Sequence, residues 1–536
     1  MQKRNNRRAV IIPVIIAVSI AAGVILGWYL PSGSHADQRE RPSPSGKIGT
    51  LMQLIGTRYV DDVDMAEIEE TALPAILRGL DPHSVYIPAR DLSRANEQIA
   101  GNFDGIGITF NMITDTLLVI STVPGGPSER VGIMAGDKII YVNDSIIAGV
   151  SIPDETVIGM LRGPRGTKVE VSVERRGVDE LMTFEITRDQ IPITTVDVAY
   201  MMTPETGYIK VTSFSMTTFN EFVTALRELK NKGMERLILD LRGNSGGVMD
   251  AATRMADQFL SDGSMIVYTE GRAFPRDDIK ATRGGEFLEG DLVVLIDEFS
   301  ASASEIVAGA IQDNDRGTVI GRRSFGKGLV QEPIMFRDGS GLRLTIARYY
   351  TPSGRSIQKP YGDGYEEYYN DLNERFLRGE LRDADSIRFA DSLQYTTKGG
   401  RVVFGGGGIM PDIFVPVDTT GVSDYFLAVR NSGIITRFSL YYTENNRESL
   451  SRIDTAEEMV SYLKSRNLLN SFVAYAESAG VAADPEGIKT SGEVIEIQLM
   501  AYIARNILNN RGFYPIWERL DNTLLKALEY ISGDDR

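Results

Sequence analysis

The sequence has 536 residues, more than one hydrophobic core usually organises, and predicts about three or four folding units. Its 42% hydrophobic and 24% charged residues are typical of a globular protein and exclude wholesale disorder. The net charge of −16 disfavours nucleic acid as a partner. Cysteine is absent and histidine occurs only as His35 and His83, which removes disulfides, thiolate chemistry and most histidine-based metal sites and catalytic triads. We therefore expect no metal and no cofactor.

Residues 1–36 have the pattern of a membrane anchor. Basic side chains come first, at Lys3, Arg4, Arg7 and Arg8, and 22 uncharged residues follow, 9–30. At about 1.5 Å per helical residue this stretch reaches roughly 33 Å, enough to cross a membrane. Because basic flanks stay cytoplasmic, we expect one transmembrane helix in the inner membrane and the remaining chain in the periplasm or a similar extracytoplasmic space. A cleaved signal peptide ending at Ser34-His35-Ala36 is the alternative.

Residues 37–101 are expected to form a polar linker, 37–46, followed by helices that contain the loop 80–84. This loop holds His83 beside Pro82. A lone histidine next to a proline turn is more often structural than catalytic, so His83 has no part in the predicted mechanism.

Residues 102–188 change to short β-rich runs separated by Gly, Pro and Asp turns. Near its start, Gly105-Ile106-Gly107-Ile108 places glycines where backbone N–H groups can hold an anion at a strand edge. Together with segments 123–127 and 136–143, this pattern resembles the PDZ family. That resemblance implies that an extended peptide tail docks as an added strand and that its terminal carboxylate sits near residues 105–108. The candidates for an apolar pocket are Ile106, Ile108, Phe110 and the helix at 154–161. Such a pocket favours protein substrates with apolar tails.

From residue 207 the pattern alternates between strands and helices, which predicts an α/β unit with a largely parallel sheet. We expect a strand at 208–214, a helix at 217–232 and a strand at 236–241. The last strand runs into a glycine-rich turn at 242–247, whose N–H groups can face a developing negative charge. The turn by itself equally fits a simple tight connection.

The next predicted strand, 291–296, leads into serines at a helix start, Ser300, Ser302 and Ser304, ahead of a helix at 306–312. Any one of them fits a helix cap, but a serine here also gains dipole support as a nucleophile. With no histidine available, its base would be a buried lysine, because burial favours the neutral amine. Lys327 follows after one helix and one strand, and Gln331 shares its face on an extended segment.

Segments 240–247, 298–306, 324–331 and 348–358 resemble the carboxyl-terminal processing, or tail-specific, protease family, over roughly residues 45–418. The resemblance implies a crotonase-like α/β core at 189–418 with an inserted PDZ domain. It also implies a Ser-Lys serine endopeptidase in which Ser302 is the nucleophile, Lys327 the general base and Gln331 its orienting partner. Backbone N–H groups of Ala303 and of Gly246 or Gly247 would form the oxyanion hole. One departure is Asn244-Ser245, where many members have Asn-Pro.

Residues 419–536 lie beyond the resemblance and have amphipathic helical patterns, including 494–508. Two interpretations remain open: a helical domain that forms homo-oligomers or docks a partner, and helices that pack on the chain's own core. The acidic, tyrosine-rich insert at 361–400 gives no functional indication.

Two other functions are considered. A non-catalytic, membrane-tethered PDZ scaffold would not need Ser302, Lys327 and Gln331 together. A crotonase-type enzyme acting on acyl thioesters would not need a tail-binding module.

Overall fold

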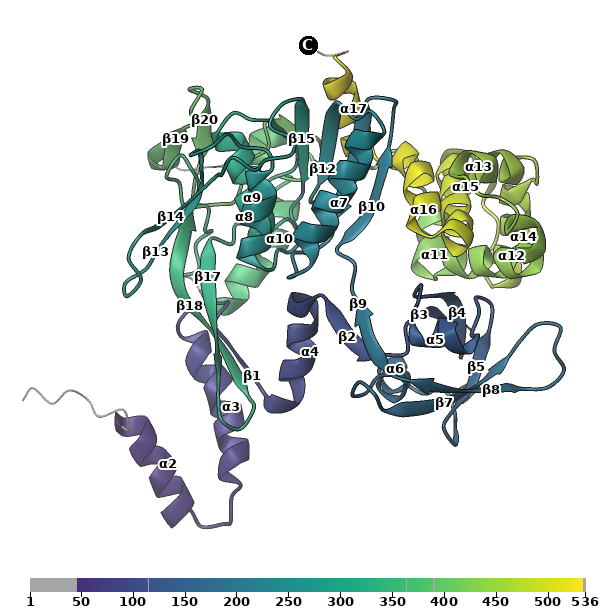
Figure 1. Ribbon diagram of the computed structural model, residues 1–536, viewed down its shortest axis with the longest axis horizontal. Coiled ribbons are helices and arrows are strands. Elements are labelled where there is room, and N and C mark those ends of the chain that lie inside the picture. The colour runs from purple at the N-terminus through teal and green to yellow at the C-terminus, as the bar shows by residue number, and fades with distance from the viewer. Residues whose placement is uncertain (1–45, 114, 363, 389–390, 534–536) are drawn as a thin grey trace, which may run out of the picture. The chain divides into compact units, whose positions relative to one another are not determined.

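The computed structural model describes residues 46–113, 115–362, 364–388 and 391–533, and the chain divides into two units, Met1–Ala72 and Leu73–Arg536 (Figure 1). The described part of the first unit contains helix α2 (Gly46–Arg58) and the start of α3 (Met65–Arg78), and neither helix has a buried residue. No helix within the described ranges is long and apolar enough to cross a membrane. The predicted anchor at 9–30 lies outside them.

The centre of the second unit is a six-stranded sheet with the order β10-β11-β12-β15-β16-β21 (Figure 1). Its strands are β10 Val196–Met201, β11 Thr206–Val211, β12 Arg236–Asp240, β15 Asp291–Ile296, β16 Thr318–Gly321 and β21 Ile413–Phe414. Only the β10–β11 pair is antiparallel, and the other neighbours are parallel. The predicted α/β unit is therefore present, although the strand expected at 208–214 ends at Val211.

Both faces of this sheet are buried, as parallel sheets require. Successive side chains on a strand point to opposite faces of the sheet, so the apolar side chains form two separate clusters, one on each face. One face packs against α7 (Thr218–Asn231), α8 (Met249–Asp257) and α9 (Ala303–Asp313). The other face packs against α17 (Asn522–Ser532), which contacts β12, β15 and β16. The face that packs on α17 includes Tyr208, Ile238, Val293, Leu295 and Ile320.

An antiparallel sheet stands beside the central one and carries the segment that follows Lys327. Its order is β1-β18-β13-β14, with β17 also paired to β18. The strands are β1 Val85–Ile87, β18 Gly341–Tyr350, β13 Met265–Glu270, β14 Asp277–Lys280 and β17 Leu329–Met335. Strand β1 belongs to a region predicted to be helical. A three-residue strand gives too short an alternation to be seen in the sequence, and it forms by pairing with β18.

The β-rich module contains one sheet of order β3-β4-β5-β7-β8, with β6 paired to β5. Its elements are β3 Ile108–Ile113, β4 Thr116–Thr122, α5 Pro127–Val131, β5 Lys138–Val142, β6 Ser145–Ile146, α6 Asp154–Leu161, β7 Lys168–Glu174 and β8 Met182–Thr187. Strands β2 (Asn102–Gly105) and β9 (Asp189–Pro192) pair at its base. Helix α4 (Ala89–Ala100) immediately precedes β2. Helix α6 has the predicted bounds, and β3 is an edge strand.

The region after residue 418 is helical but does not form a single separate layer. Its helices are α11 Asp424–Asn431, α12 Ile434–Leu450, α13 Ala456–Lys464, α14 Leu468–Ser478, α15 Pro485–Leu508, α16 Asn510–Trp517, the short η3 Glu518–Leu520 and α17. Helices α11–α16 enclose their own apolar cluster, although α16 also contacts β10, and α17 packs on the central sheet. Of the two interpretations of this region, packing on the chain's own core thus holds for its final helix.

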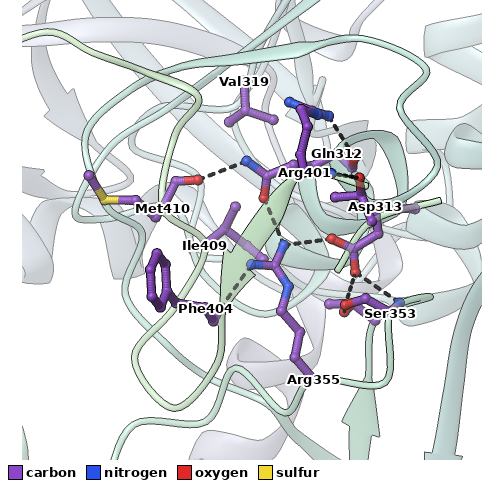
Figure 2. A network of polar contacts seen from close by, with 12 residues as sticks. Gln312, Asp313, Val319, Ser353, Arg355, Arg401, Phe404, Ile409 and Met410 are labelled. Carbon is purple, nitrogen blue, oxygen red and sulfur yellow. Dashed lines mark hydrogen bonds and ion pairs between the residues drawn. The ribbon is translucent and has the colours of Figure 1, made fainter. Parts of the chain in front are cut away.

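The insert and the residues just after it contain α10 (Tyr365–Leu377), the short helices η1 (Ala384–Ser386) and η2 (Asp391–Leu393), and the hairpin β19 (Gln394–Thr396) and β20 (Val402–Phe404). A fully buried arginine, Arg355, connects this hairpin to the end of α9 (Figure 2). Its guanidinium pairs with Asp313 (2.8 Å) and donates to Gln312 Oε1 (2.7 Å) and to the Phe404 carbonyl (2.9 Å). Asp313 also accepts from the Ser353 N–H and hydroxyl. These bonds fix the far end of the helix that begins after Ser302.

Candidate active site

A cavity of about 480 Å³ opens where α4, the turn at 245–249, the start of α9 and strands β17 and β18 meet. Its lining is mainly apolar, and it includes the predicted site residues Ser302, Ala303, Gly246, Gly247, Lys327 and Gln331. Residues separated by up to 85 positions in the sequence therefore share one cavity wall.

Ser302 stands where β15 gives way to α9. It is the N-cap residue of α9, with φ 55° and ψ −111°, a conformation that residues with a side chain rarely adopt. Its N–H donates to Glu305 Oε2 (2.7 Å) within the first turn. Gly246 makes room for this turn, since a Cβ at Gly246 would lie 2.7 Å from the Ser302 Cβ. The turn thus holds Ser302 at the cavity wall.

The N–H groups predicted to form an oxyanion hole differ in their partners. The Gly246 N–H already donates to Asn244 Oδ1 (2.9 Å). In the described ranges, neither the Gly247 N–H nor the Ala303 N–H has a backbone or side-chain acceptor, and Ala303 is the first residue of α9, where no intrahelical acceptor exists. Gly247 and Ala303 are therefore the pair that can receive a substrate oxygen.

Lys327 and Gln331 are in direct contact. Lys327 Nζ donates to Gln331 Oε1 (3.2 Å), and Gln331 Nε2 donates to the backbone carbonyl of His83 (3.0 Å). The Gln331 amide is thus held at both ends, with its oxygen toward the lysine. The His83 imidazole points elsewhere, with Nε2 2.8 Å from the hydroxyl of Tyr368 on α10.

Glu305 and Tyr349 join the backbones of Ser302 and Lys327 from two sides. Glu305 Oε2 accepts from the N–H groups of both residues, at 2.7 Å and 2.9 Å. The hydroxyl of Tyr349 lies 3.1 Å from the Ser302 carbonyl and 2.6 Å from the Lys327 carbonyl. Glu305 and Tyr349 are almost completely buried, so water does not compete for these bonds. The arrangement fixes the two residues beside each other.

Burial also sets the protonation of this site. It lowers the pKa of Lys327 below its ordinary value, with a further lowering from the positive charge of Arg343, while Glu305 and Asp81 oppose the effect. Burial raises the pKa of Glu305 to about 7, although four hydrogen-bond donors oppose this rise. The pKa of His83 falls to about 4, because of burial and the charge of Lys327. His83 is therefore neutral at pH 7, and the Lys327 amine loses its proton more readily than an exposed lysine.

The predicted peptide-binding residues run from the end of β2, where Gly105 lies, to the start of the edge strand β3. Gly107 has φ 73°, and a Cβ there would lie 3.0 Å from Ile191 Cδ1. Ile106 is 3% exposed and belongs to the module's core, and its carbonyl accepts from Ser128. Its side chain is thus part of the core and does not line an open pocket, whereas Ile108 and Phe110 are only partly buried.

Sequence reasoning missed three contributors to the site: the carboxylate of Glu305, the hydroxyl of Tyr349 and the carbonyl of His83. Glu305 had a readable signal, because Ser302 and Glu305 have the S-x-x-E spacing of a helix capping box. Tyr349 and His83 had none, since each acts through a contact that only the folded chain creates.

Comparisons with known proteins show which families the chain is similar to. The model of Peptidase family S41 matches residues 205–364, the PDZ domain model matches 97–174, and a family of unknown function matches 425–509. The carboxy-terminal-processing protease of Bartonella bacilliformis is 35% identical over 354 residues, covering 63% of this chain and 80% of that protein. Carboxy-terminal processing protease CtpA of Bacillus subtilis is 31% identical over 350 residues, 65% of this chain and 74% of that protein.

Among solved structures, the photosystem II D1 C-terminal processing protease is 24% identical, with a TM-score of 0.35, covering 69% of this chain and 92% of that one. The chain belongs to the carboxy-terminal processing serine proteases of peptidase family S41. The predicted family, the enzyme class, the PDZ domain and the mixed α/β fold with a C-terminal helical region are thereby confirmed.

Proposed function

We propose that this chain is a serine endopeptidase in which Ser302 is the nucleophile, Lys327 the general base and Gln331 the group that orients the lysine amine. The observation that carries the proposal is the shared carboxylate oxygen of Glu305, which lies within 2.9 Å of the N–H groups of both Ser302 and Lys327. With Tyr349 on the other side, this contact sets the two side chains at one cavity.

In the proposed mechanism, neutral Lys327 takes the hydroxyl proton of Ser302 as Ser302 attacks a peptide carbonyl. The N–H groups of Ala303 and Gly247 stabilise the negative charge that develops on the carbonyl oxygen. Lys327 then gives its proton to the departing amine, and water repeats the sequence on the acyl-enzyme. Gln331 keeps the amine directed toward Ser302 because its own amide is held by the His83 carbonyl.

The proposal extends to the architecture and the substrates. We assign the α/β core to a crotonase-like arrangement and the substrates to periplasmic proteins with apolar C-terminal tails. The support is the edge strand β3, whose free side can pair with an extended tail. The uncharged stretch at 9–30 supports tethering to the inner membrane.

The test is proteolysis by the full chain of an unfolded protein that ends in an apolar tail. We expect cleavage, and we expect it to weaken when the tail carries a terminal carboxamide, because the PDZ domain then loses the carboxylate. Ser302→Ala should abolish cleavage. Ser304→Ala is the matched control, since the Ser304 hydroxyl donates to the Asn244 carbonyl outside the cavity lining and should leave cleavage largely intact. Equal cleavage by the wild type and Ser302→Ala would overturn the proposal.

Arg162 is expected to couple the PDZ domain to the cavity. Its guanidinium pairs with Glu97 (2.7 Å) on α4, the helix that supplies Ala95 and Ile99 to the cavity lining. Arg162→Ala should reduce the preference for tailed over tailless substrates several-fold. It should change the free energy of unfolding by about 1 kcal/mol or less, because the pair is partly exposed.

Arg165→Ala is the control for that experiment, since the Arg165 guanidinium pairs with Asp189 on β9, at the base of the PDZ domain itself. Competition between tailed and tailless substrates in one reaction measures the preference. An unchanged preference in Arg162→Ala would show that the Arg162–Glu97 contact does not transmit tail binding.

A further inference from the structure

Arg343 brings a positive charge without an acidic partner into the cavity that holds Ser302. It lies on β18, and the guanidinium Nη2 donates to the Ala95 carbonyl (2.9 Å) and Asn96 Oδ1 (3.4 Å), both neutral acceptors. Across the described residues, no Asp or Glu lies within ion-pair distance of Arg343. Arg322, another poorly exposed arginine of the core, does have such a partner in Glu298.

The strand register places Arg343 on the reacting side of the sheet. Thr345 stands opposite Gln331, and Arg343 stands opposite Pro333, two residues further along both strands. Side chains at alternate positions share a face, so Arg343 is on the face from which Gln331 reaches Lys327. Arg343 and Lys327 both line the cavity. A cation at this position is therefore available to a bound peptide.

Partial burial makes such a cation selective for carboxylates. A guanidinium that has lost water without gaining an acidic partner forms a strong, charge-assisted bond when a carboxylate arrives. A peptide offers carboxylates of two kinds, the terminal group and the side chains of Asp and Glu. The cavity of about 480 Å³ accepts only a short stretch of peptide around the cleaved bond.

We propose that Arg343 forms a carboxylate subsite beside the reacting bond, so that the protease prefers substrates with a carboxylate within a few residues of the cleaved bond. This inference rests on the proposed peptidase function of the same cavity. The subsite is distinct from the tail-binding edge of the PDZ domain, because its residues come from β18 and α4.

Arg343 also has a second role, which affects the cleavage rate of all substrates equally. Its charge lowers the pKa of Lys327, and its bonds to Ala95 and Asn96 hold α4. Removal of the charge therefore slows cleavage of every peptide and moves the pH profile upward. A carboxylate subsite has a different signature, since it changes the ratio of rates between matched charged and neutral peptides.

The experiment uses the full chain and peptides of one sequence in which Glu, Gln or Lys occupies, in turn, each of three positions on either side of the cleaved bond. Peptides of a second set end one, two or three residues after the cleaved bond, either as the free acid or as the carboxamide. We expect wild-type kcat/KM to favour Glu over Gln about ten- to hundredfold at one position, as a charge-assisted bond implies. A preference confined to the free-acid set identifies the terminal carboxylate as the ligand.

Arg343→Gln should reduce this ratio to about one, and Arg343→Glu should make the Lys peptide the preferred one. Arg348→Gln, a change at an exposed arginine of the same strand, should keep the wild-type ratio. Cleavage without any carboxylate preference in the wild type, or the same preference in Arg343→Gln, would overturn the subsite and leave the peptidase assignment intact. Failure of wild-type enzyme to cleave any peptide would overturn both.

Discussion

Replacement of Lys327 by Met is expected to lower kcat/KM for peptide cleavage by about 10³-fold or more, because the hydroxyl of Ser302 then has no base. Lys327→Arg should lose as much, since a guanidinium stays protonated at any working pH. Both variants keep a long side chain in the cavity, so binding should suffer less than turnover. Single-turnover and steady-state kinetics on one peptide separate the two effects.

The pH dependence of cleavage by the wild-type enzyme is a second test of the same prediction. The rate should rise with pH as the Lys327 amine loses its proton, and the midpoint should lie below the ordinary lysine value of 10.5, because burial and Arg343 lower this pKa. Lys359→Met is the matched control. Lys359 is also buried, but its amine bonds to Tyr368 and Asp371, so its loss should leave the midpoint in place. Full activity of Lys327→Met would exclude a lysine base.

Glu305→Gln is the second change for which we expect a large effect. The carboxylate accepts four hydrogen bonds, from the N–H groups of Ser302, Gly326 and Lys327 and from the Ser324 hydroxyl. A glutamine amide offers one oxygen and turns an N–H₂ group toward the remaining donors. With two buried donors unsatisfied at about 1–3 kcal/mol each, the free energy of unfolding should fall by about 2–6 kcal/mol. Catalysis should fall as well, because Ser302 and Lys327 lose their common anchor.

Chemical denaturation and peptide kinetics on Glu305→Gln and on Glu298→Gln test this prediction. Glu298 is similarly buried on the preceding turn but pairs with Arg322, so Glu298→Gln should reduce stability and retain much more activity. A Glu305→Gln enzyme with wild-type kinetics would remove Glu305 from the site.

The ionisation of Glu305 also predicts how stability varies with pH. The folded chain holds this proton more tightly than the unfolded chain, because burial raises the pKa from the ordinary 4.5 to about 7. More protons are therefore bound by the folded state between these values, and the contribution of Glu305 to the free energy of unfolding falls as pH rises through this window. Glu305→Gln lacks a titrating group here and should lose that part of the pH dependence.

Much of the fold follows from local sequence patterns. The bounds predicted for β15 and α6 agree with the structure, because an apolar run between turn residues and a short amphipathic stretch need no distant partner to be recognised. The helix expected at 306–312 is longer and begins at Ala303, since the small residues after Ser302 are already helical. At the site, Ser302, Lys327 and Gln331 lie at the same cavity, which the order of the motifs indicated.

The parts that escaped prediction depend on contacts between distant segments. The sequence of the insert gives no functional indication, yet Tyr368 on α10 reaches the His83 ring, and Tyr369 donates to the Pro82 carbonyl of the same loop. These partners are more than 280 positions apart. The amphipathic pattern of the region 419–536 likewise predicts helices without showing which surface each helix covers. Such contacts leave no pattern in a single sequence, because each segment has its own regular pattern whether or not it contacts the other.

The packing of α17 has a consequence for the order in which the protein matures. Strands β12, β15 and β16 are synthesised more than 200 residues before α17, and until α17 has been made their second face lacks the helix that covers it. The layer beneath the Ser302 turn is therefore finished only after residues 522–532 have been made. The central sheet therefore reaches its final packing later in synthesis than the segments that carry Ser302 and Lys327.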